Sequence, residues 1–359
     1  ESVYILVKSI IEQKGPVQKN RALACLLQLL SYPYGGVVSC RHLAYRFKLF
    51  QARKLPVPVI SVGNLTLGGT GKTPVVSLLT RLLVNKGVRP AIVSRGYGGM
   101  ASEGVNVVSD GNTLLLNAEF SGDEPFMLAR KFPGVPVVTG KSRYRAGLFA
   151  CKDLHAELVI LDDGYQHMQL FRDLNILLLD GQEFFGNGYL FPRGPLREPE
   201  GQKKRADLIW FTKCQKEAGG PKTDIGMVPV VCSGIRPLKL QSFDGKIQNS
   251  INAISGKSVY AFCGIGAPVS FFTLLKSVGA TITGQSIFED HHQYRADEIE
   301  NIVSKALKAG AEYIVTTEKD SVRIQLPRDP AIPFFFLTME VEIWEGQDEL
   351  EKAVYALLR

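Results

Sequence analysis

The stretch GNLTLGGTGKTPVV, residues 63–76, carries the residue types of a phosphate-binding loop. The strict pattern is G-x-x-x-x-G-K-[ST], and Thr66 stands where that pattern has its first glycine. The later glycines would let backbone amides approach an anion, Lys72 could reach the β- and γ-phosphates of a nucleotide, and Thr73 could offer its hydroxyl to Mg²⁺. We therefore expect a nucleotide site made of Thr66, Leu67, Gly68, Gly69, Thr70, Gly71, Lys72 and Thr73.

Two carboxylates, Asp162 and Asp163, end the apolar run in ELVILDDGYQH. The carboxyl ends of parallel strands form the edge at which α/β folds bind ligands, and a magnesium ion bound through Thr73 needs a carboxylate partner there. A strand that ends in aspartate is also common in helix caps and turns. With the phosphate loop present, we interpret Thr73, Asp162 and Asp163 as a magnesium site.

Five further segments gather polar residues at the ends of apolar runs. They are SRGYGG (94–99), SGDEP (121–125), RGPLREP (193–199), FEDHHQY (288–294) and TTEKD (316–320). Taken singly, Arg95 could be a solvated loop residue, Asp123 and Glu124 could cap a helix, and His291 could be a satisfied core histidine. Transfer of a phosphoryl group to an alcohol, however, needs a base near the hydroxyl, and an Asp–His pair could act as that base. Asp123 and His291 are the candidates, although their spacing does not show that they meet.

The elements that would position these residues alternate between strand and helix. From Pro56 onward, apolar β-branched runs and helical patterns follow one another, which predicts a doubly wound parallel sheet over residues 56–250. The alternation of strand and helix patterns begins again after a polar stretch. It predicts a smaller α/β unit over residues 251–359, with a helix as its last element. A length of 359 residues agrees with more than one unit. The six scattered cysteines include no C-x-x-C and argue against a zinc site or a disulfide framework.

The net charge of +7 lies in an N-terminal arm, residues 1–55, which holds nine basic and two acidic residues. Its apolar run breaks at the sequence YPYGG, and Arg41 and His42 interrupt it too early for a bilayer span of about 20 apolar residues. We expect either a helical hairpin in the headgroup region of a membrane with anionic lipid, or a helix pair packed on the rest of the protein. The arm shows no cleavable signal pattern, and no nucleic-acid-binding motif accompanies its charge.

Seven of these segments, taken in order, resemble the tetraacyldisaccharide 4′-kinase family, the lipid A 4′-kinases. The segments are VPVISVGNLTLGGTGKTP, SRGYGG, GDEP, ILDDGYQH, GPLREP, EDHHQY and TEKD. The resemblance implies a P-loop NTPase-type fold with a smaller C-terminal subdomain and a membrane-docking N-terminal helix. It also implies transfer of the γ-phosphate of ATP to the 4′-hydroxyl of an acylated glucosamine disaccharide 1-phosphate, giving lipid IVA in lipid A biosynthesis. The implied location is the cytoplasmic face of the inner membrane.

The same resemblance assigns roles to individual residues. It implies that Asp123 and His291 form the catalytic pair, with His291 favoured over the adjacent His292. It implies that ATP lies on the loop from Thr66 to Thr73 and that Asp162 and Asp163 coordinate metal and phosphate. The remaining contacts to substrate or nucleotide that it implies are Arg95, Tyr97, Glu124, His167, Arg197 and Glu198.

Two other classes of protein share some of these features. A regulatory GTPase has a phosphate loop and a strand-end aspartate, but the nearest candidate for its guanine-reading motif, WFTKCQ, has Gln215 where a carboxylate is needed. A membrane-tethered nucleotide sensor without catalysis would not need Asp123 and His291. The sequence therefore favours an ATP- and Mg²⁺-dependent lipid-sugar kinase.

Overall fold

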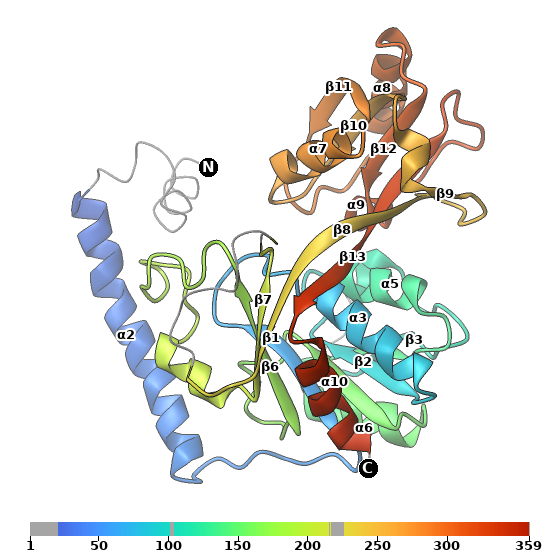
Figure 1. The fold of residues 1–359 in the computed structure, drawn as a ribbon. Coiled ribbons are helices and arrows are strands. Elements are labelled where there is room, and N and C mark those ends of the chain that lie inside the picture. Colours follow the sequence, from blue (N-terminus) through green and yellow to red (C-terminus); the bar gives the residue numbers. More distant parts are fainter. Residues whose placement is uncertain (1–20, 101–103, 215, 217–225, 359) are drawn as a thin grey trace.

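The computed structural model describes residues 21–100, 104–214, 216 and 226–358. Within them, a larger and a smaller α/β unit are joined by two long strands, and one long helix lies along the side of the larger unit (Figure 1). Residues 1–20 of the predicted arm lie outside the described residues.

The larger unit is a mainly parallel sheet in the strand order β7-β6-β1-β5-β2-β4-β3, in which only β3 runs antiparallel to its neighbour. Nearly every residue of the parallel strands is buried, which explains why they read as continuous apolar runs. The strands are β1 (Val59–Asn64), β2 (Pro90–Ser94), β3 (Asn106–Ser109), β4 (Val137–Thr139), β5 (Leu158–Asp162), β6 (Leu174–Asp180) and β7 (Leu208–Thr212). The helices are α3 (Lys72–Asn85), α4 (Ala118–Ser121), α5 (Asp123–Lys131), α6 (Arg143–Lys152) and the 3₁₀-helix η2 (Glu200–Arg205). The doubly wound sheet predicted from the sequence is confirmed.

The smaller unit is built on the parallel strands β11, β10 and β12, in that order. Apolar residues of α7 and of the strands form one of its cores, and residues of α8 form the other. Its strands are β9 (Gln248–Ser250), β10 (Ser258–Cys263), β11 (Thr281–Ile287) and β12 (Tyr313–Thr317), and its helices are η4 (Ile251–Ile254), α7 (Pro268–Ser277), α8 (Ala296–Lys308) and α9 (Glu318–Ser321).

Two long antiparallel strands, β8 (Val230–Ser242) and β13 (Phe334–Glu345), belong to both units. The first residues of β8 pair with β7 of the larger unit, and the first residues of β13 pair with β12 of the smaller one. A single 13-stranded sheet therefore runs through the molecule. The chain leaves the larger unit along β8, before the boundary that was predicted after residue 250.

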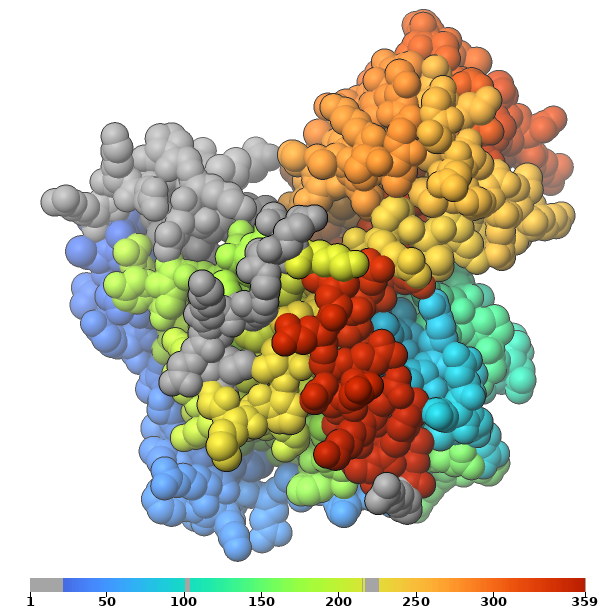
Figure 2. Space-filling model, in the orientation of Figure 1, coloured from blue at the N-terminus to red at the C-terminus, as the bar shows by residue number. Residues whose placement is uncertain are grey.

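The last helix, α10 (Gln347–Tyr355), packs on the larger unit beside α3 (Figures 1 and 2). Its residues Leu350 and Val354 are fully buried in the same core cluster as Val75 and Leu79 of α3. The prediction that the final helix completes the smaller unit is therefore wrong. Strand β13 returns the chain from the smaller unit to the larger one. The helices that follow, α10 and the short η5 (Ala356–Leu358), therefore lie at the larger unit, where α10 covers an apolar face.

The N-terminal arm contains one continuous helix, α2 (Arg21–Arg46), and the predicted hairpin is wrong. Pro33 lies inside this helix. Gly35 is needed for close packing and not for a turn, because a Cβ there would lie 2.8 Å from Leu190 Cδ1. Within the described residues, α2 is the one helix that is long and apolar enough, by length and composition, to cross a membrane.

Candidate active site

The phosphate loop joins β1 to α3 and leaves space for an anion. Its left-handed residues are Gly68, with a φ of 104°, and Gly71, with a φ of 74°. A Cβ added at Gly68 or Gly69 would meet nothing within 4 Å, so the backbone there is open to a ligand. In the described chain no side chain caps α3 and its first turn has no acidic residue, so its first N–H groups are available to a phosphate.

Two neighbouring segments hold this loop in place. Thr66 forms an isolated β-bridge with Leu196, and the N–H of Arg197 donates to the carbonyl of Leu65 at 2.7 Å. On the other side, the hydroxyl of Thr212, at the end of β7, donates to the carbonyl of Thr70 at 2.9 Å. Thr66 therefore serves as a pairing residue where the strict motif has glycine, and the turn is made by the glycines that follow.

The predicted strand-end carboxylates lie beside the loop. The register of β1 and β5 sets Val62 against Asp162, so Asp162 and Asp163 end at the start of the phosphate loop. Asp163, which has a φ of 54°, accepts from Arg197 at 2.9 Å and lies 3.5 Å from Lys72 Nζ. Lys72 Nζ also lies 3.4 Å from Asn64 Oδ1. The structure thus brings together the lysine, the carboxylates and the arginine that were predicted separately.

The two carboxylates differ in charge state because their contacts differ. Burial raises the pKa of Asp163, but the charges of Lys72 and Arg197 outweigh it and hold that pKa below its usual value. Asp162 is fully buried, and burial together with the charge of Glu124 raises its pKa to about 7, although Lys72 opposes the shift. The Oδ1 atom of Asp162 has no hydrogen-bond partner among the described residues.

An orphaned, buried carboxylate oxygen beside a phosphate loop fits a magnesium ion. Among the described residues no cluster of three or more His, Cys, Asp or Glu side chains could hold a metal ion by itself. Mg²⁺ in nucleotide sites typically takes one or two carboxylates and completes its shell with phosphates and water. Asp162 and the hydroxyl of Thr73, a buried residue at the start of α3, match that donor set.

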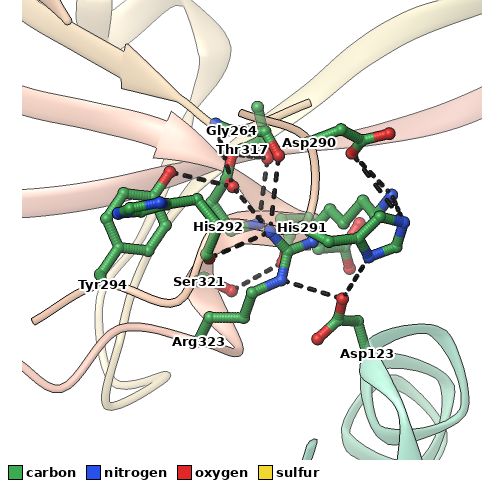
Figure 3. A network of polar contacts seen from close by, with 12 residues as sticks. Asp123, Gly264, Asp290, His291, His292, Tyr294, Thr317, Ser321 and Arg323 are labelled. Carbon is green, nitrogen blue, oxygen red and sulfur yellow. Dashed lines mark hydrogen bonds and ion pairs between the residues drawn. The ribbon is translucent and has the colours of Figure 1, made fainter. Parts of the chain in front are cut away.

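Asp123 and His291 meet, although 168 positions separate them in the chain (Figure 3). The Nδ1 atom of His291 lies 2.8 Å from Oδ2 of Asp123. Asp123 is the first residue of α5 in the larger unit, and His291 follows β11 in the smaller one. The Asp123 side chain is 9% exposed and the His291 side chain 49%, so one partner is enclosed and the other faces solvent. The pair exists only where the two units touch.

Local backbone geometry positions both members of this pair. Gly122, with a φ of 87°, is the residue before α5, and a Cβ there would lie 2.6 Å from the carbonyl oxygen of Tyr97. The SRGYGG segment therefore lies against the start of α5. His291 itself has a φ of 65°, a strained conformation for a residue with a side chain. Such strain is often found where a side chain must point at a reacting group.

The neighbouring histidine has a different environment. His292 Nε2 lies 3.0 Å from Glu298, and its ring stacks on Phe288. The structure therefore places His291, and not His292, against Asp123. On the far side of the His291 ring, Nε2 lies 3.3 Å from Lys319 Nζ, which also donates to Asp290 at 3.3 Å.

Three of the remaining predicted residues take part in electrostatic interactions: Glu124 acts on Asp162, and Arg95 acts on His167. Glu124 acts on the pKa of Asp162 and thereby connects the start of α5 to the phosphate loop. Burial, followed by the charges of Arg143, Arg172 and Arg95, lowers the pKa of His167 to about 4, so this ring is neutral. Tyr97, by contrast, is 82% exposed at the surface.

Sequence analysis missed Arg143, a buried arginine at the start of α6. Its Nε has no partner among the described residues, and its Nη1 donates to carbonyls of Lys141 at 3.3 Å and Gly140 at 3.5 Å. Burial, the largest influence, and the charge of Arg95 lower its pKa, although the carboxylates Asp163 and Asp162 oppose the shift. The segment TGKSR, with a basic pair after a buried strand, was the signal that could have identified it.

Glu198 points toward α2 and not toward the phosphate loop or its carboxylates. Its side chain is fully buried and forms ion pairs with Arg41 of α2, at 2.6 Å, and with Arg205. The hydroxyl of Tyr34, also on α2, donates to the carbonyl of Arg197 at 2.8 Å. Glu198 has no exposed surface and anchors α2 beside Arg197, and the substrate or nucleotide contact implied for it stays a prediction.

We expect Glu198→Gln to destabilise the protein by about 3 kcal/mol, because it removes the charge that compensates Arg205 in a buried pair. A fall in the urea midpoint of unfolding would measure this loss. Glu157→Gln is the matched control, since Glu157 pairs with Arg89 at 2.9 Å while both side chains remain largely exposed. Equal midpoints for the two variants would contradict the anchoring role.

The arrangement can bind a nucleotide phosphate and accept a proton from a hydroxyl. Comparison with known proteins agrees with this chemistry. Residues 23–359 match the family model described as Tetraacyldisaccharide-1-P 4'-kinase, LpxK. A protein named Tetraacyldisaccharide 4'-kinase from Syntrophus aciditrophicus is 41% identical, over 97% of this chain and 96% of that protein. Its counterpart from Geobacter metallireducens is 42% identical, over 85% of this chain and 90% of that protein.

A solved structure is also similar. The crystal structure of LpxK from Aquifex aeolicus in complex with ATP has a TM-score of 0.80 and a sequence identity of 34%. The similarity covers 94% of this chain and all of that one.

Proposed function

Because this chain belongs to the tetraacyldisaccharide-1-P 4′-kinase family, we propose that it transfers the γ-phosphate of ATP to the 4′-hydroxyl of tetraacyldisaccharide 1-phosphate. The product is lipid IVA, an intermediate of lipid A biosynthesis. The observation that carries the proposal is the 2.8 Å contact between Asp123 and His291, a potential base at the start of α5, where the adjacent Glu124 acts on Asp162 at the phosphate loop. A nucleotide switch or sensor would have no use for that pair.

In the proposed reaction, the 4′-oxygen forms a bond to the γ-phosphorus while the bond from that phosphorus to the ADP oxygen breaks. The proton of the hydroxyl goes to the Asp123–His291 pair, which we treat as one unit. Lys72, held beside Asn64 and Asp163, places positive charge on the phosphates. Arg197, which reaches Asp163 at 2.9 Å, supplies a second positive charge at the same edge of the sheet.

Further residues of this chain would orient the two substrates. Mg²⁺, held by Thr73 and Asp162, would neutralise charge on the phosphates when nucleotide is bound. In our proposal Arg95, Glu124 and His167 contact nucleotide or the sugar headgroup; Glu124 acts on the pKa of Asp162, and Arg95 acts on that of His167. Exposed Tyr97 would meet the acceptor at the edge of the site.

We further propose that α2 docks the enzyme on the cytoplasmic face of the inner membrane. One face of the helix holds it on the larger unit through buried Leu27 and Val38 and through the Arg41–Glu198 pair. The other face leaves a row of large apolar side chains exposed: Leu26, Leu29, Leu30, Tyr32, Val37 and Leu43. An amphipathic helix of this kind lies in the headgroup region, where basic residues meet anionic lipid. The acceptor keeps its acyl chains in the same leaflet.

The docking role predicts a loss of membrane binding when the exposed face becomes charged. Leu29→Glu with Val37→Glu should reduce the fraction that floats with anionic vesicles by about tenfold, because each change removes apolar burial and adds repulsion. Val269→Glu with Leu307→Glu, at exposed apolar residues of α7 and α8 in the smaller unit, is the control with the same change of charge. Unchanged flotation of the Leu29→Glu, Val37→Glu variant would exclude this face of α2 as the membrane contact.

The proposed function is tested by incubating the protein with γ-labelled ATP, Mg²⁺ and tetraacyldisaccharide 1-phosphate in detergent micelles. Label should appear in the lipid and resist removal of the 1-phosphate by mild acid, since the new phosphate is on the 4′-oxygen. Nucleotide binding without labelled lipid would exclude the kinase activity and favour a membrane-bound switch or sensor.

A further inference from the structure

Arg323 is a buried arginine in the smaller unit, shortly after α9, to which the proposed reaction gives no role. Its side chain has no exposed surface. It lies three residues beyond the TTEKD segment, and the sequence patterns do not select it. Figure 3 shows its guanidinium at the centre of the contacts that join Asp123 to the smaller unit.

The smaller unit holds this guanidinium from one side. Nη1 of Arg323 lies 3.4 Å from Asp320 Oδ1 and donates at the same distance to the carbonyls of Gly264 and His292. The Gly264 carbonyl also accepts the backbone N–H of His291, at 3.3 Å. Arg323 therefore contacts the loop of His291 directly at the His292 carbonyl, and indirectly through the Gly264 carbonyl, which the His291 N–H shares.

The other side of Arg323 faces the larger unit. Its Nε lies 2.9 Å from Oδ2 of Asp123, the oxygen that also contacts His291 Nδ1. One side chain thus contacts both the carboxylate and the histidine loop of the proposed catalytic pair. Its Nη2 is buried and has no partner within the described residues, so the contacts with Asp123 and with the smaller unit do not use all of its donors.

We propose that Arg323 is a positioning residue for phosphoryl transfer, which holds ionised Asp123 and the His291 loop in the arrangement needed to accept the proton of the acceptor hydroxyl. This inference rests on the proposed function. The alternative role is structural: the buried ion pair between Arg323 and Asp123 would only join the two units, and it would not affect the part that Asp123 takes in proton transfer.

The two roles differ in their effect on pH dependence. Burial raises the pKa of Asp123, but the hydrogen bond from His291 and the charge of Arg323 outweigh it, so the net pKa is lowered. Without Arg323, burial is opposed by His291 alone and the pKa of Asp123 rises. The other charges nearby are Asp320, behind Arg323, and Lys319 with Asp290, beyond His291. Because the ionised carboxylate is the active form, the acidic side of the kcat profile should move to higher pH.

The test compares Arg323→Met and Arg323→Lys with a matched control, Lys131→Met. Lys131 of α5 pairs with Glu318 of α9 at 3.0 Å and so joins the same two units without touching Asp123. We expect kcat for transfer of labelled phosphate to fall about tenfold or more in Arg323→Met, since the buried ion pair that holds Asp123 is lost. Arg323→Lys should keep part of the rate, because it keeps the charge, and Lys131→Met should keep all of it.

Repeating the substitution in an Asp123→Asn variant decides whether Arg323 affects kcat through Asp123. In Asp123→Asn, adding Arg323→Met should lower kcat less than about twofold further, because residues that act as a unit are not additive. A full, independent loss in that background, or an unshifted pH profile, would overturn the positioning role. If Arg323→Met does not fold, the effect of Arg323→Lys on kcat is compared in the wild-type and Asp123→Asn proteins instead. Absence of transfer by the wild-type protein would instead refute the proposed function, and the inference with it.

Discussion

Asp123→Asn is expected to lower kcat about a thousandfold while changing the affinity for ATP only slightly. The amide keeps the size of the side chain but lacks the charge with which the carboxylate orients the His291 ring across 2.8 Å. His291→Gln should give a loss of similar size, because the pair acts as a unit. Single-turnover transfer of labelled phosphate measures kcat, and fluorescent-nucleotide titration measures affinity.

The double variant provides the sharper comparison. If the two residues share one proton-accepting function, Asp123→Asn with His291→Gln should be about as slow as either single variant. His292→Gln is the matched control, because its ring contacts Glu298 and Phe288, away from Asp123. Multiplicative losses in the double variant, or near-normal turnover in either single one, would refute the assignment of the pair.

Lys72→Ala should lower kcat/KM by about a thousandfold, because the phosphates lose a positive charge in a partly enclosed site. The Lys72 side chain is 14% exposed and lies between Asn64 and Asp163, so its ammonium is already oriented before nucleotide arrives. Without it, the repulsion between Asp163 and phosphate is opposed less strongly, with Arg197 as the cation in contact with that carboxylate. Nucleotide binding should weaken together with turnover, unlike the result expected for Asp123.

A control for Lys72 is Lys86→Ala, near the other end of α3, where the ammonium lies over the ring of Tyr355 and far along the helix from the loop. It should leave transfer unchanged. If Lys72→Ala retained more than about a tenth of the wild-type kcat/KM, the loop would be binding phosphate through its backbone alone, and its lysine would have no catalytic part.

Strand-end motifs made much of the site predictable. The phosphate loop, Asp162 and Asp163 each follow a buried apolar run, and parallel strands bring such ends to one edge. The contact between Asp123 and His291 could not be obtained in this way. It depends on how two units meet, which follows from the path of β8 and β13 and has no local signature in the sequence.

The errors have local causes too. The YPYGG sequence has the composition of a turn, yet in α2 Pro33 is tolerated inside the helix and Gly35 allows contact with Leu190. Arg197 and Glu198 were expected together as contacts because the family resemblance implies both. Burial separates the two: Arg197 points toward Asp163, and Glu198 points toward α2.

The return of the chain along β13 determines when the larger unit can be completed during synthesis. Leu350 and Val354 of α10 belong to its core, so the ribosome must release almost the whole chain before that core is closed. The smaller unit, whose cores lie between Leu240 and Leu337, is translated completely before α10 exists. The smaller unit, which lies between two parts of the larger one in the sequence, can therefore fold first. The core of the nucleotide-binding unit begins earlier in the chain but is completed only after α10 has been synthesised.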